Sequence, residues 1–80
     1  MEETRIKHDK IIIGHNIRRI RLEKGIGQTE LVRMMQLRGI SIYRESLVKI
    51  ERGCQHITAS QLVGFKECLK TSYEELLREQ

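Results

Sequence analysis

Apolar residues recur along the chain at the spacing of an α-helix, in short segments separated by glycine or by small polar residues. Ile13, Ile17 and Ile20 occupy positions i, i+4 and i+7, so they share one face of a helix. Gly25 follows this segment, and glycine readily adopts the left-handed conformation that commonly ends a helix. The pattern predicts a first helix over residues 11–24. Asn16, within this helix, is expected at the surface.

The next two predicted helices are shorter. One begins at Gln28 and ends near residues 36–38, before Gly39, and the other covers residues 44–52 and ends before Gly53. Their inward-facing apolar positions are Leu31, Val32, Met35, Leu47 and Ile50.

Two capping boxes mark the starts of the last two helices. In Thr58–Gln61 and in Ser72–Glu75, a hydroxyl residue is followed three positions later by Gln or Glu, a spacing that satisfies free N–H groups at a helix start. The helices that they open are predicted at residues 59–69 and 73–79. Their apolar residues are Leu62, Phe65, Leu69, Leu76 and Leu77.

Composition agrees with a helical fold. The 80 residues include no proline, 39% are hydrophobic and only 4% are aromatic, so the core must consist of Ile, Leu, Val and Met. Five short helices in one chain of this length predict an all-α fold, a compact five-helix bundle, with residues 11–80 as a single domain. Residues 1–10 are mostly polar and charged, and we expect them to form a flexible N-terminal arm.

Charge is unevenly distributed. The formal net charge is +4; residues 1–53 contain 12 Lys or Arg against 7 Asp or Glu, whereas residues 54–80 contain 3 against 4. A basic N-terminal two-thirds fits a polyanionic partner such as nucleic acid. An ordinary solvated surface explains the charge equally well, so charge alone does not decide the function.

The sequence lacks the residues that several classes of function require. Cys54 and Cys68 are too few for a disulfide scaffold, and Cys54 with His56 lacks two further ligands for a zinc site. There is no nucleophile–base set and no phosphate-binding glycine loop, so we expect no enzyme activity, no metal and no cofactor. No stretch approaches the roughly 20 apolar residues of a membrane span, and the start has no signal-peptide pattern. We therefore expect a soluble, cytoplasmic protein without membrane association.

The helix over residues 44–52 has an outward face suited to base recognition. Once Leu47 and Ile50 point inward, the remaining side chains form one exposed stripe. Arginine or lysine can bind guanine in the major groove, glutamate can accept from the cytosine amine, and valine can contact a thymine methyl group. A solvated helix face is the alternative interpretation of this stripe. Its residues are Arg44, Glu45, Val48 and Lys49, and Ser46 beside them can also reach a base or a phosphate.

Three segments resemble the Cro/repressor-type helix-turn-helix domains, the xenobiotic-response-element family with the lambda-repressor-like fold. Residues 16–31 (NIRRIRLEKGIGQTEL) are similar to the opening of these domains, residues 47–53 (LVKIERG) to the end of their recognition helix, and residues 72–77 (SYEELL) to their final helix. The resemblance covers roughly residues 13–77. The combination of Gly-x-x-Gln at the start and Ile-Glu-Arg-Gly at the end makes it specific.

The resemblance implies a role for each matching residue. Gln28 matches a phosphate-binding residue at the start of the second helix, and Arg52 matches a position that contacts the DNA backbone. Arg21 and Glu51 match a pair that joins the first helix to the third, and we expect a partly buried ion pair between them. The positions that match base-reading residues are Arg44, Glu45, Ser46 and Lys49.

The chain departs from most relatives in the turn before the recognition helix. The link Leu37–Tyr43 is a few residues longer, and Val32 occupies a position where relatives often have alanine. Tyr43 takes the capping position that relatives fill with Ser, Thr or Asp. Its hydroxyl can reach a phosphate, or its ring can pack on the longer link.

The function implied by these observations is sequence-specific binding of duplex DNA by a transcription regulator. A homodimer would place two helices 44–52 in successive major grooves of a near-palindromic operator, and residues 73–80 are the first candidate for the dimer contact. The alternative is an antitoxin-type interaction protein that binds a toxin partner and autoregulates its operon.

Overall fold

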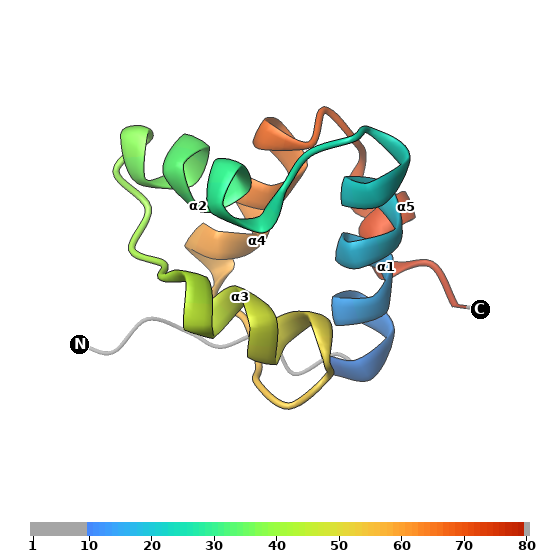
Figure 1. Ribbon diagram of the computed structural model, residues 1–80. Helices are drawn as coiled ribbons and strands as arrows, with labels where there is room; N and C mark the ends of the chain where they lie inside the picture. The colour runs from blue at the N-terminus through green and yellow to red at the C-terminus, as the bar shows by residue number, and fades with distance from the viewer. Residues whose placement is uncertain (1–9, 80) are drawn as a thin grey trace.

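Every predicted helix is present, with ends that shift by at most two residues. The computed structural model of the protein describes residues 10–79, and this part of the chain forms five α-helices without a β-sheet (Figure 1). They are α1 (Lys10–Glu23), α2 (Gln28–Leu37), α3 (Arg44–Glu51), α4 (Ala59–Cys68) and α5 (Tyr73–Leu77). The all-α class is confirmed. Residues 1–9 of the expected arm lie outside the described residues, whereas Lys10 is the first residue of α1.

Both predicted capping residues lie at helix starts, but only the capping box at Thr58 has both of its bonds, since the Glu75 carboxylate at the second site pairs with Arg19 and Arg78. The Thr58 hydroxyl accepts from the Gln61 N–H at 3.1 Å, and the Gln61 side chain accepts from the Thr58 N–H at the same distance. The Ser72 hydroxyl accepts from the Glu75 N–H at 3.1 Å. These bonds satisfy donors that no intrahelical carbonyl can reach, and they fix where α4 and α5 begin.

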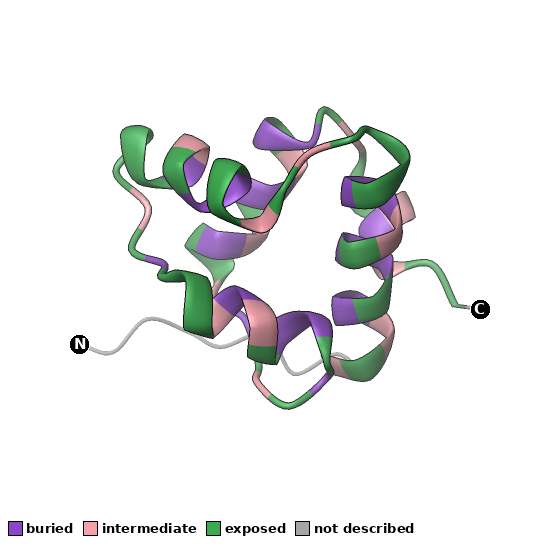
Figure 2. Ribbon diagram, viewed as in Figure 1, coloured by how far each residue is buried: buried purple, intermediate pink, exposed green. Residues whose placement is uncertain are grey.

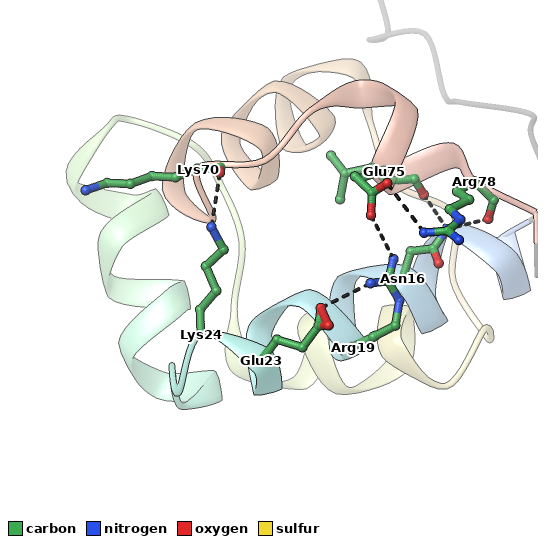
Figure 3. Close-up of polar contacts among 8 residues, drawn as sticks. Asn16, Arg19, Glu23, Lys24, Lys70, Glu75 and Arg78 are labelled. Atoms are coloured by element: carbon green, nitrogen blue, oxygen red, sulfur yellow. Dashed lines mark hydrogen bonds and ion pairs between the residues drawn. The ribbon is translucent and has the colours of Figure 1, made fainter.

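α5 ends two residues earlier than predicted because α1 binds its last carbonyls. The side-chain amide of Asn16 donates to the carbonyls of Leu76 at 2.9 Å and Arg78 at 2.7 Å, and Arg78 has extended backbone angles (Figure 3). Asn16 has no exposed surface, so the expected surface position is wrong. It lies on the same helix face as Ile13 and Ile20, and its polar atoms are tolerated there because they are hydrogen-bonded.

The core lies where the five helices pack against one another. α1 packs on α3 and α5, and α2 packs on α3 and α4. Figure 2 shows the buried residues of all five helices on their inward faces. No helix within residues 10–79 has the length and apolar character required to cross a membrane. The side chains with no exposed surface include Ile17, Leu31, Met35, Leu47, Ile50, Phe65, Leu69 and Leu76.

Gly14 allows α1 and α3 to approach each other closely. A methyl group at this position would overlap the carbonyl oxygen of Ile50 and come within 2.9 Å of the Ile50 carbonyl carbon. The contact is with backbone atoms in the last turn of α3, which cannot rotate away. Only glycine at this position therefore lets α3 lie where the structure places it.

Gly64 has a different neighbour. A methyl group there would meet the Cδ1 atom of Ile40 and come within 2.9 Å of the Cε atom of Met35, both at the ends of flexible side chains. The glycine thus makes room for the longer link between α2 and α3 within the same chain.

Replacing Gly14 tests the close approach. Gly14→Ala is expected to lower the free energy of unfolding by roughly 1–3 kcal/mol or more, since overpacking against backbone outweighs the gain in helix propensity. Urea denaturation followed by circular dichroism measures this change. Gly64→Ala is the matched control, also inside a helix, and should be clearly less destabilising. Equal effects of the two substitutions would contradict this account of Gly14.

Candidate nucleic-acid interface

α3 presents a polar face to solvent while its other face is anchored in the core. Leu47 and Ile50 have no exposed surface, whereas Arg44, Glu45 and Lys49 are exposed. The outward stripe expected from the sequence is therefore present. In Figure 1, α3 lies along the lower edge of the bundle.

The stripe has two edges. Arg44 and Val48, one helical turn apart, border a cleft between α3 and α1, and Arg52 continues this row just after the helix. Glu45 and Lys49 form the neighbouring row and do not line the cleft. The side chains of α3 therefore divide into a cleft edge and an outer edge.

A buried ion pair holds α1 to α3. The Nε and Nη2 atoms of Arg21 donate to the two carboxylate oxygens of Glu51 at 2.7 and 2.9 Å, as expected from the resemblance. The two residues are 6% and 4% exposed. The Nη1 atom of Arg21 also donates to the Ile26 carbonyl at 2.9 Å. A bidentate pair with its remaining donors satisfied is the geometry that makes burial of two charges tolerable.

Gln28 joins the same network from the start of α2. Its Nε2 atom donates to a carboxylate oxygen of Glu51 at 3.1 Å. A carboxylate only accepts, so this contact fixes the amide group of Gln28 with its nitrogen towards Glu51. The side chain thereby ties α2 to α3 and, through Glu51, to Arg21 of α1.

The cleft collects side chains from three helices. It has a volume of about 820 Å³. Gln28, Arg44 and Arg52 are members of this site that the sequence predicted as DNA contacts, whereas His15 and Arg18 were not predicted as members. The available signal was their spacing in α1, because His15, Arg18 and Arg21 are each three positions apart and therefore lie on neighbouring positions of one side of the helix. The lining residues are His15, Arg18, Gln28, Arg44, Val48, Glu51 and Arg52.

The longer link between α2 and α3 is held by two glutamine side chains. The Nε2 atom of Gln36 donates to the Ile42 carbonyl at 2.8 Å, and that of Gln61 donates to the Ser41 carbonyl at 3.0 Å. Ile42 is 2% exposed and so inserts into the core. The link therefore has a defined conformation that fixes where α3 begins.

Tyr43 stands at the N-cap of α3 without a side-chain capping bond. It is 64% exposed, so most of the side chain faces solvent, and it borders a pocket together with Gln36 and residues 39–42 of the link. Ile42 supplies the apolar anchor of this segment in its place. The hydroxyl of Tyr43 remains accessible at the solvent side of α3.

The cysteines stand apart from the cleft. Cys54 is exposed, Cys68 is buried, and both are free thiols. Burial raises the pKa of the Cys68 thiol, which keeps it protonated and unreactive at neutral pH. Within residues 10–79, no group of three or more His, Cys, Asp or Glu residues is arranged to bind a metal.

The fold is similar to that of several solved structures. The TM-score is 0.74 with the clp gene regulator ClgR from C. glutamicum, at 22% identity over 95% of this chain and 87% of that one. It is 0.71 with the restriction-modification controller protein C.AhdI from Aeromonas hydrophila, at 24% identity over 85% and 96%. The chain has the fold of a helix-turn-helix transcription regulator.

A third solved structure of this fold contains DNA. It is the restriction-modification controller protein C.Esp1396I, a tetramer in complex with its natural 35-base-pair operator. The TM-score is 0.68, at 25% identity over 86% of this chain and 95% of that one. No family model matches the chain, and no curated protein matches it in sequence.

The buried ion pair of this helix-turn-helix domain can be tested by removing one charge. Glu51→Gln keeps the shape of the side chain but leaves the buried Arg21 cation uncompensated, so we expect a loss of about 3–5 kcal/mol in the free energy of unfolding. Thermal and urea denaturation measure it. Glu75→Gln makes the same change in a partly exposed ion pair with Arg19, and its effect should stay below about 1 kcal/mol. Similar melting of the two variants would contradict the structural role of Glu51.

The contact from Gln61 to the link gives a second test. Gln61→Glu can still accept from the Thr58 N–H, but it cannot donate to the Ser41 carbonyl, and it brings two acceptors together. We expect the free energy of unfolding to fall by about 1–3 kcal/mol. Glu67→Gln, the reverse change at an exposed position of α4, is the control and should leave stability nearly unchanged. If Gln61→Glu is as stable as wild type, the link does not depend on this bond.

Proposed function

We propose that the protein is a transcription regulator that binds duplex DNA sequence-specifically by inserting α3 into the major groove. No catalytic step is part of this function. The side chains proposed to contact base edges are Arg44, Glu45, Ser46 and Lys49.

The observation that carries this proposal is the polar face of α3 on a rigid frame. Base recognition requires side chains that project from an element whose position is fixed to within a fraction of an ångström. α3 is anchored by Leu47 and Ile50, by the backbone contact at Gly14 and by the ion pair of Glu51 with α1. Its exposed arginine, lysine and glutamate are chemically suited to base edges.

Contacts to phosphates would set the position of the domain on the duplex. Gln28, Tyr43 and Arg52 are proposed for this role. Gly27, the N-cap of α2, has no side chain to bind the N–H groups of the first helical turn, so these groups can donate to a phosphate. Arg52 is exposed at the end of α3, and its guanidinium group is suited to bind the same phosphate.

A homodimer would be the functional unit. A single α3 can contact only a few base pairs, whereas two copies about 34–36 Å apart read a near-palindromic operator. The multimeric state of C.Esp1396I on its operator supports assembly on DNA for a protein of this fold.

Fluorescence anisotropy on duplex DNA tests the proposed function. Wild-type protein and the double variant Arg44→Ala/Lys49→Ala are compared on DNA from upstream of the gene and on a duplex of random sequence, over a salt series. Wild type should prefer the upstream DNA by roughly 10³-fold or more, and binding should weaken steeply with salt. The double variant should lose this preference and retain weak binding to both duplexes.

The control variant Arg19→Ala/Arg78→Ala removes two positive charges that lie outside the cleft, on the α5 side of α1. These arginines form ion pairs with Glu75 of α5 (Figure 3). The control should keep the preference for upstream DNA. If wild type binds no duplex even at low salt, the protein is not a DNA-binding regulator.

A further inference from the structure

Three arginines of α1 lie within one helical turn of each other but in different surroundings. Arg21 is buried against Glu51, and Arg19 forms ion pairs with Glu23 and Glu75 on the α5 side (Figure 3). Arg18 is exposed at the cleft between α1 and α3. None of the ion pairs within residues 10–79 includes Arg18.

The other arginines of the cleft share this property. Arg44 and Arg52, on the α3 side, are exposed and take part in no ion pair within the described part of the chain. The positive charges of the cleft thus come from two separate elements, with α1 contributing one and α3 with its C-cap contributing two.

The carboxylate in the cleft does not neutralise these charges. Glu51 already binds Arg21 through both oxygens, and one oxygen also accepts from Gln28. Its charge is compensated by Arg21, which does not line the cleft. The cleft therefore keeps an excess of positive charge and exposed guanidinium donors, a combination that selects an anion with several acceptor oxygens.

The position of the cleft identifies the anion. The cleft runs along the cleft edge of α3, which contains Arg44 and Val48. The outer edge, with Glu45 and Lys49, lies directly beside it. A helix that enters the major groove is flanked by the phosphates of the groove walls. A group that faces α3 across this cleft, such as Arg18 of α1, therefore meets the backbone, whereas Arg44 on α3 itself still reaches a base edge. The anion that fits is a phosphodiester of the same duplex.

We infer that the cleft binds one phosphodiester group of the DNA backbone and that Arg18 of α1 is a DNA contact, on the opposite side of this phosphate from Arg52. This role rests on the proposed DNA binding by α3. It makes α1 part of the interface, and it assigns Arg18 to sequence-independent positioning of the domain.

Two adjacent arginines of α1 provide a matched experiment. Arg18→Gln and Arg19→Gln make the same change in charge at neighbouring positions, one in the cleft and one on the α5 side. Binding to a short labelled duplex of random sequence and to DNA from upstream of the gene is measured by anisotropy over a salt series. Thermal denaturation of each variant establishes that the domain is folded.

Arg18→Gln should reduce the slope of log affinity against log salt by about one unit. At 0.1 M salt this corresponds to an approximately eightfold loss of affinity, the same for both duplexes. Arg19→Gln should stay within about twofold of wild type. Arg18→Lys, which keeps the charge, should retain the wild-type slope.

Each other outcome is informative. If Arg18→Gln matches Arg19→Gln while wild type binds DNA, Arg18 is not a contact, although DNA binding by α3 stands. If Arg18→Gln weakens binding to the upstream DNA but not to the random duplex, Arg18 reads sequence and the phosphate assignment is wrong. If wild type binds neither duplex, both the contact and the proposed function are wrong.

Discussion

The ion pair between Arg21 and Glu51 is the interaction on which the geometry of the candidate interface depends. It joins α1 to the last turn of α3, and Gln28 extends it to the first turn of α2. Two buried charges stabilise a fold only when their geometry is good and their remaining hydrogen-bonding groups are satisfied. Here Arg21 also binds the Ile26 carbonyl, so the network fixes three helices at one point.

α1 serves as the frame for the other elements. Gly14 lets the carbonyl of Ile50 approach it, Asn16 binds the end of α5, and Arg21 binds Glu51. These contacts lie within about two turns of a single helix. Arg18 lies on the exposed side of α1 and lines the cleft. The helix that holds α3 in place therefore also borders the cleft beside α3.

The link between α2 and α3 determines how α3 is presented. Its length alone suggests a mobile connection, but the buried Ile42 and the glutamine donors at two of its carbonyls give it a fixed path. Gly64 of α4 supplies the space for Ile40. The longer turn is therefore compensated by residues in α2 and α4, and α3 remains anchored by Leu47 and Ile50.

The sequence by itself determined the five helices, their capping residues and the two faces of α3, because these depend on local spacing and on hydrogen bonds between near neighbours. The resemblance added the pairing of Arg21 with Glu51. Only the tertiary structure decided that Asn16 is buried, that α5 ends at Leu77 and that Arg18 borders the cleft. Each of these depends on which helix lies opposite a given turn of α1, and helical periodicity carries no information about the identity of that neighbour.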